Sequence, residues 1–286
     1  MCDEKLPNYG HLPYTDLSRR SFAALAAAAA AGLAGGAQAQ AAVVEKKVKV
    51  KTPDGVCDAV LFYPARGGAK PGALVWPDAG GLRPAMSDIA KRTAGLGYVA
   101  LVVNPYYRAG DAAAVAALDN KVPEQLAKKN AARPSTPEMA ARDAKAFVAY
   151  LDALPQTSNA KVGVQGYCMG GALSVRTAAA VPGRIGAVCS FHGGNGLVSK
   201  DETSPHLLID KTKARYLFAT AQNDDKTDPA VKGSLRATLF KAGLPGDVDV
   251  YAANHGWMAP DGAQYNQAEA ERGWKALTDV YGRSLV

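Results

Sequence analysis

A cysteine between two glycines is the side chain in this sequence best suited to covalent chemistry. Cys168 lies within Gly166-Tyr167-Cys168-Met169-Gly170-Gly171, after a compact apolar run and before an apolar pattern with helical spacing. Strand, sharp turn and helix in that order are typical of a nucleophile elbow, here with sulfur in place of oxygen. Glycines fit the flanking positions because the strained turn brings them against a strand and a helix. A buried cysteine between packing glycines would give the same letters, but the strand and the helix favour a nucleophile, whose thiolate the helix N-terminus stabilises.

A thiol nucleophile needs a base, and the base needs a group that orients it. In enzymes with a nucleophile elbow, the acid and then the histidine follow the nucleophile along the chain. Among the four histidines, His11 lies near the N-terminus, and His192 and His206 precede the only plausible acid-bearing strand. His255 follows the last expected strand and has the right order. We therefore predict His255 as the base, in preference to an ordinary loop histidine.

The orienting acid is expected in the loop after the strand Ala214–Ala221. That loop contains three aspartates, at positions 224, 225 and 228. Counting forward from the strand favours Asp224, whereas counting back from Pro229 favours Asp225. We prefer Asp224, because the strand fixes its distance to the sheet while the loop length can vary. The alternative stays open, and any of these residues could instead be a turn residue or a helix cap, which Asp228 resembles.

Other groups could bind the reacting carbonyl or the rest of a substrate. The backbone N–H groups of Met169 and Ala79 are predicted to hold the oxyanion, since both follow strands that end at the site. Arg108 follows the strand Tyr98–Val103, and its planar guanidinium could bind a substrate carboxylate. Arg83, after the oxyanion loop, is a second candidate. Arg108 could instead be a solvated surface residue, and Arg83 could cap the next helix or pair with a nearby aspartate.

Strands and helices alternate through most of the chain. Strands are expected over Val43–Lys51, Cys57–Tyr63, Ala73–Trp76, Tyr98–Val103, Lys161–Gln165, Ile185–Phe191, Ala214–Ala221 and Val248–Ala252. Helices are expected up to Gly95, over Gly110–Asn130 with a break at Pro123, and over Pro137–Leu154, Ala172–Ala180, Ala230–Ala242 and Gly262–Tyr281. This alternation predicts an α/β fold, with a mostly parallel sheet covered by helices on both faces and a ligand site beyond the carboxyl ends of the strands.

The N-terminal segment has the pattern of a targeting signal. Residues 17–22 contain the arginine pair Arg19-Arg20, an Ala-rich segment follows to Leu33, and Ala37-Gln38-Ala39 offers a cleavage site. The apolar stretch is shorter than the ~20 strongly apolar residues that a membrane span needs. We predict a twin-arginine signal peptide over residues 1–40, a catalytic domain over residues 41–286, export to the periplasm and no other association with membranes.

Composition excludes several classes of function. The net charge of +7 is not gathered into a Lys/Arg run with aromatic residues, so nucleic acid is not an expected partner. The sequence has neither a C-x-x-C nor an H-E-x-x-H motif, and we predict no metal and no cofactor. Cys57, Cys168 and Cys189 form an odd set in the mature chain, so at least one thiol is free, and whether Cys57 and Cys189 pair stays open. The expected partner is a small molecule, bound by a monomer.

Taken together, these residues resemble the dienelactone hydrolase family, also called carboxymethylenebutenolidases, within the α/β-hydrolase superfamily. The stretch 166–171 is similar to the family's elbow, whose distinguishing nucleophile is cysteine. His255-Gly256-Trp257 and the Asp224 loop lie where the family has its histidine and aspartate. The segment 104–108, Asn-Pro-Tyr-Tyr-Arg, is similar to one that carries a substrate-carboxylate arginine. The resemblance runs from about Val43 onward and implies an α/β-hydrolase that opens an unsaturated lactone through a thioester acyl-enzyme.

Two departures from the family pattern bear on the substrate. Asp78 stands where founding members carry a glutamate that holds the resting thiol, so the resemblance implies that Asp78 tunes Cys168. Founding members also carry a second arginine shortly after the histidine, whereas residues 257–260 here are Trp-Met-Ala-Pro. We expect one carboxylate contact instead of two, apolar substrate contacts from Trp257 and Met258, and acceptance of neutral as well as anionic esters and lactones. Alternatives are a broad esterase or thioesterase on this scaffold, and a non-catalytic small-molecule binding protein.

Overall fold

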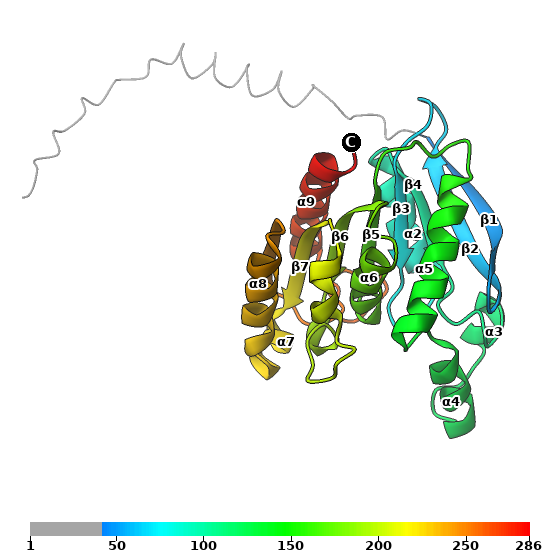
Figure 1. Ribbon diagram of the computed structural model, residues 1–286. Coiled ribbons are helices and arrows are strands. Elements are labelled where there is room, and N and C mark those ends of the chain that lie inside the picture. Colours follow the sequence, from blue (N-terminus) through cyan, green and yellow to red (C-terminus); the bar gives the residue numbers. More distant parts are fainter. Residues whose placement is uncertain (1–41) are drawn as a thin grey trace, which may run out of the picture. The chain divides into compact units, whose positions relative to one another are not determined.

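An eight-stranded sheet runs through residues 42–286, the part of the chain that the computed structural model describes (Figure 1). The strands are β1 (Val43–Thr52), β2 (Gly55–Pro64), β3 (Gly72–Trp76), β4 (Val99–Val103), β5 (Val162–Tyr167), β6 (Ile185–Phe191), β7 (Arg215–Ala221) and β8 (Gly246–Tyr251). Their order in the sheet is β1-β2-β4-β3-β5-β6-β7-β8. The β1–β2 hairpin and the β2–β4 pair are antiparallel, and the strands from β4 to β8 are parallel to one another. The predicted mostly parallel sheet is confirmed.

Helices cover both faces of this sheet. They are α2 (Pro84–Gly95), α3 (Ala112–Ala116), α4 (Pro123–Ala132), α5 (Pro137–Asp152), α6 (Met169–Ala180), α7 (Gln222–Thr227), α8 (Ala230–Ala242) and α9 (Gln267–Ser284). Helices α5, α6 and α8 contribute to the hydrophobic cluster on one face, and α2 and α9 contribute to the cluster on the other (Figure 1). The parallel strands therefore have little contact with solvent, as their nearly continuous apolar sequences require.

The short strand β3 shows how the sequence fills both layers. All of its side chains are buried, and they alternate between the two clusters. Leu74 and Trp76 pack on the α5 side, where the Trp76 ring meets Phe147 edge to face with centroids 5.5 Å apart. Ala73 and Val75 pack on the α2 side. This strand ends beside β5, which places the loop after Trp76 next to Cys168.

Several boundaries differ from those expected from sequence. The acid-bearing loop folds into the short helix α7, and a 3-10 helix at Pro205–Lys211 was not expected. The last helix begins at Gln267 instead of Gly262, because the Asn266 side chain caps it by accepting the Glu269 N–H at 3.0 Å. Helical pattern alone did not distinguish that cap from the loop before it.

No helix in residues 42–286 is both long enough and apolar enough to cross a bilayer. The predicted signal peptide, residues 1–40, lies outside the described residues.

A buried ion cluster fastens the β1–β2 turn to α5. Arg108 donates to Asp143 at 2.8 and 3.0 Å and to Asp54 at 2.6 and 3.1 Å, and its guanidinium lies 4.5 Å from the Tyr107 ring centroid. The Asp143 side chain is 1% exposed and also accepts the Tyr107 hydroxyl at 2.7 Å. Burial raises the pKa of Asp143, against the opposing effect of its bonds to Arg108 and Tyr107. The Asp143 carboxylate therefore depends on Arg108 for compensation.

Replacing Arg108 should consequently damage the fold. Arg108→Ala leaves a buried carboxylate without its cation, which typically costs about 3–5 kcal/mol. We expect urea denaturation to show a loss of that order in the free energy of unfolding. Arg142→Ala is the matched control, because Arg142 also bonds Asp54 but lies at the surface, and it should have a much smaller effect. Equal small losses for both variants would contradict this account of the cluster.

Candidate active site

The elbow after β5 holds Cys168 in a strained backbone conformation. Its φ of 53° and ψ of −117° lie outside the regions that most side chains adopt, and the residue directly precedes α6. A Cβ at Gly166 would overlap the Gly170 carbonyl, and a Cβ at Gly170 would overlap the Trp76 carbonyl. The glycine spacing in the sequence is therefore a steric requirement of this turn.

His255 and Asp224 lie together at the carboxyl ends of the strands. The Nδ1 atom of His255 is 2.7 Å from Oδ2 of Asp224, and the two side chains are 34% and 17% exposed. The His255 backbone N–H also donates to Oδ1 of Asn223 at 2.7 Å, so the start of α7 holds both the ring and the backbone of His255. Asp225 points elsewhere and accepts Lys232 Nζ at 2.8 Å.

The surroundings of His255 favour its protonated form. Its hydrogen bond with Asp224, and secondarily the neighbouring Cys168, raises the pKa of His255 to about 10, from an ordinary value of 6.5. Cys168 is partly exposed, so a substrate can approach the pair. The structure thus brings together Cys168, His255 and Asp224, which lie far apart in the sequence.

The backbone N–H groups in and near the elbow differ in whether the protein supplies an acceptor for them. Within the described residues, the N–H groups of Met169 and Ala79 have no protein acceptor. By contrast, the N–H groups of Gly80 and Gly81 both bond Asp78, at 2.8 and 2.9 Å. The Tyr106 hydroxyl donates to the Ala79 carbonyl at 3.0 Å and fixes the orientation of that loop. Tyr106 was not identified from sequence, where it is one of two adjacent tyrosines with no distinguishing pattern.

Asp78 and Arg83 have roles other than those expected. Arg83 binds Asp78 through two bonds of 2.6 and 3.0 Å and Asp261 through two more of 2.7 and 2.9 Å. In residues 42–286, neither oxygen of Asp78 has a hydrogen bond with the Cys168 thiol. The shorter aspartate instead organises its own loop, and Arg83 connects that loop to the segment after His255. The bonds of Asp78 and Arg83 therefore do not include the thiol contact or the free guanidinium that the sequence analysis expected.

Two further residues expected to bind a substrate are engaged within the protein. The Arg108 guanidinium is 13% exposed and already bonded to two carboxylates, so it is not free to bind a substrate carboxylate. Trp257 is 0% exposed and Met258 1%. The Trp257 ring stacks on Tyr251 with centroids 4.6 Å apart, which makes it part of the core beneath the site. Adjacency to His255 in sequence did not reveal that the chain turns inward there.

His192, which has the wrong chain order for a base, lies in the site. His192 follows β6 directly and is completely buried. The Cys168 N–H donates to its Nδ1 at 3.2 Å, and its ring centroid is 5.0 Å from that of His255. Chain order had excluded His192 as a base. The sequence did offer a signal for a different role, because His192 directly follows β6, the strand next to β5.

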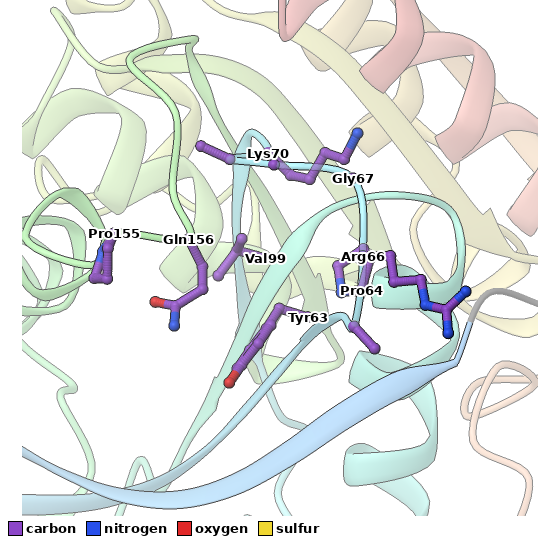
Figure 2. Close-up of a pocket in the computed structure, with 11 residues that line it drawn as sticks. Tyr63, Pro64, Arg66, Gly67, Lys70, Val99, Pro155 and Gln156 are labelled. Carbon is purple, nitrogen blue, oxygen red and sulfur yellow. The ribbon is translucent and has the colours of Figure 1, made fainter.

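Several cavities of the molecule lie away from Cys168, His255 and Asp224. One, of about 330 Å³, lies at the amino ends of β3 and β4 and is lined by residues such as Tyr63, Lys70, Val99 and Gln156 (Figure 2). Because Cys168 follows the carboxyl end of β5, this cavity is at the opposite edge of the sheet. Among residues 42–286, no cluster of His, Cys, Asp and Glu side chains is suited to hold a metal ion.

Comparison with known proteins agrees with this geometry. A model of the dienelactone hydrolase family matches residues 57–285. The chain belongs to the dienelactone hydrolase family. Membership identifies it as a carboxylic ester hydrolase, and the resemblance noted in its sequence is confirmed.

Individual relatives of this dienelactone hydrolase family member support the assignment. The chain is 29% identical over 245 residues to a Methylorubrum extorquens protein assigned as a carboxymethylenebutenolidase, covering 84% of this chain and 81% of that protein. A Klebsiella pneumoniae structure assigned as a dienelactone hydrolase aligns with a TM-score of 0.68 at 18% identity, covering 85% of this chain and 99% of that one. The Pyrococcus horikoshii acylaminoacyl peptidase aligns with a TM-score of 0.61 at 13% identity, covering 89% of this chain and 43% of that one. These structural alignments show a shared α/β-hydrolase fold.

The bond between Asp224 and His255 should make stability depend on pH. The pKa of His255 is about 10 in the folded chain and 6.5 for an ordinary histidine, so folding favours its protonated form. The resulting stabilisation is complete below pH 6.5 and is lost as the pH rises towards 10. Asp224→Asn removes the largest cause of the raised pKa. The loss in free energy of unfolding caused by this substitution should therefore be largest just below pH 6.5 and shrink towards pH 10. Urea titrations across that range measure it, and a loss that grows with pH would contradict the assignment.

Proposed function

We propose that this hydrolase uses Cys168 as nucleophile, His255 as acid and base, and Asp224 as the group that orients His255. The observation that carries the proposal is the 2.7 Å bond between Asp224 and His255, beside a partly exposed thiol on a strained elbow. A nucleophile, a base and an orienting acid in that order form the functional unit of acyl-transfer enzymes.

The proposed reaction has two stages. In the first, His255 holds the proton of the Cys168 thiol, and the resulting thiolate attacks the carbonyl carbon. The N–H groups of Met169 and Ala79 bind the oxyanion, and the C–O bond breaks to leave a thioester. His255 gives its proton to the departing alkoxide, which in a lactone remains part of the same molecule. In the second, a water molecule loses a proton to His255 and attacks the thioester, which releases the carboxylic acid and leaves the Cys168 thiolate beside protonated His255.

The charge of His255 suits the first stage. A pKa raised to about 10 keeps the ring protonated at neutral pH, so the proton that the alkoxide needs is already present. The same positive charge stabilises negative charge on the attacking sulfur. Asp224 holds Nδ1 and so leaves Nε2 to face the reacting groups.

The substrates that we propose are esters and lactones, neutral as well as anionic. Arg83 and Arg108 each bond two carboxylates of the protein, so neither offers an uncompensated charge for a substrate carboxylate. A charged hydrogen bond contributes roughly 1.5–3 kcal/mol, and its absence weakens a preference for anionic substrates by at least about tenfold. A broad esterase or thioesterase activity on the same scaffold is the second candidate, which the pairing of these two arginines favours.

Replacing Cys168 distinguishes an enzyme from a non-catalytic binding protein. Cys168→Ala should lower kcat on the order of 10⁴-fold or more, since members of a triad act as a unit. Wild type should release a burst of p-nitrophenol from p-nitrophenyl acetate, followed by a slower steady state. A panel of neutral and carboxylated esters and lactones, assayed with both proteins, identifies the substrate class. Stoichiometric binding of a panel compound without turnover would instead support a non-catalytic binding protein.

Alkylation offers an independent check on the nucleophile. Cys57 and Cys189 are buried, and burial raises the pKa of both thiols, whereas Cys168 is partly exposed beside His255. Iodoacetamide should therefore label Cys168 first, as mapped by mass spectrometry of peptides. Faster labelling of either buried cysteine would count against the proposal.

We further propose that the protein is exported to the periplasm by the twin-arginine route, on the strength of the Arg19-Arg20 pattern. Changing Arg19→Lys together with Arg20→Lys should leave the uncleaved precursor in the cytoplasm, because the pattern is read by a receptor. Cell fractionation and N-terminal sequencing measure the outcome, with mature protein expected to begin near Gln40. Continued export of the double variant would show that another signal operates.

A further inference from the structure

His192 lies beneath the nucleophile and touches the residues proposed for catalysis. It follows β6, whose last residue pairs with the last residue of β5, so His192 and Cys168 leave the sheet side by side. The Cys168 N–H is shared between the Phe191 carbonyl at 3.1 Å and His192 Nδ1 at 3.2 Å. Two residues further on, Gly194 lies so close to Asp224 that a Cβ there would be 3.0 Å from Oδ2.

The hydrogen bond from Cys168 determines which nitrogen of His192 carries the proton. Because an N–H donates to Nδ1, Nδ1 must be unprotonated, and a neutral ring then has its hydrogen on Nε2. The titratable groups around the ring are Cys168, His255 and Tyr167. Burial, and secondarily the charge of His255, lowers the pKa of His192 to about 3. The ring is therefore a neutral acceptor at any pH where the enzyme would work.

Keeping this histidine is costly to the fold. Its φ of 39° is unusual for a residue with a side chain, and among the described residues only Cys168 shares a positive φ without being glycine. Its Nε2 is buried and has no protein partner in residues 42–286. A buried unpaired donor costs about 1–3 kcal/mol, and strained backbone costs a similar amount. Such costs persist mainly at functional sites, where they serve to hold a geometry.

We propose that His192 is a positioning residue for the nucleophile, whose Nδ1 holds the Cys168 peptide in the strained conformation that aims the thiol at the substrate carbonyl. The role rests on the proposed function of Cys168. It is distinct from proton transfer, because Nδ1 is occupied by the Cys168 N–H. The two residues with strained backbones thus support each other through one hydrogen bond.

Three substitutions separate the hydrogen bond from backbone strain and from side-chain volume. His192→Asn can place an amide oxygen near the position of Nδ1, and asparagine tolerates positive φ. His192→Gly tolerates the backbone but has no acceptor. His192→Leu has nearly the shape of asparagine without polar atoms. We expect kcat for p-nitrophenyl acetate on the order of 100-fold lower for the Gly and Leu variants than for the Asn variant, with KM changed little.

A purely structural role would give a different pattern. The kcat of each variant would then follow its thermal stability. The Asn and Gly variants would have equal kcat under conditions where both are folded, and that result would overturn the proposal. The rate of Cys168 alkylation by iodoacetamide, expected to fall in the Gly and Leu variants and not in the Asn variant, tests positioning even if the ester is not hydrolysed. Cys168→Ala assayed alongside shows separately whether the proposed function itself fails.

One further test uses the wild-type protein and does not depend on whether any variant folds. Ring ¹⁵N spectra should show His192 as the neutral Nε2–H tautomer from acidic to alkaline pH, with Nδ1 as the hydrogen-bonded acceptor. A protonated Nδ1 would remove the acceptor on which the proposal depends and would overturn it.

Discussion

The site depends on holding one residue in a backbone conformation that it would not adopt by itself. Cys168 has a positive φ, and the strain is accepted because β5, α6 and the β3 loop close around it. Gly166 and Gly170 make that closure possible by leaving no side chain in the way. The peptide of Cys168 is then fixed from below by the residues that end β6. The parallel sheet is what makes this possible, because it brings the ends of β3, β5 and β6 to one edge.

The two arginines that follow β3 and β4 at this edge, Arg83 and Arg108, are paired with carboxylates of the protein. Arg83 is bound between Asp78 and Asp261, and it thereby links the oxyanion loop to the segment that follows His255. The polar groups that we propose meet the reacting carbonyl are the His255 ring, the thiol and the backbone N–H groups of Met169 and Ala79. Groups of this kind stabilise the negative charge that develops on a reacting carbonyl.

The fold and the proposed triad could be predicted from sequence because both rest on local patterns. Short apolar strands, helices between them and a G-x-C-x-G turn fix where Cys168 must lie, and chain order then selects His255. Side-chain partners across the structure could not be predicted in this way. Arg108 looked free because its partner Asp143 lies on a helix 35 residues away. His192 was excluded because chain order identifies a base and says nothing about an acceptor for a backbone N–H.

The central claim is that Cys168 carries the acyl group during turnover, and its most direct test is mass spectrometry of the intact protein. Wild-type protein mixed with p-nitrophenyl acetate and quenched in acid within the burst should gain the mass of one acetyl group. Peptide mapping should place that group on Cys168, and longer incubation should remove it. Hydrolysis that proceeds at the same rate with no acyl group ever found on Cys168 would contradict the account.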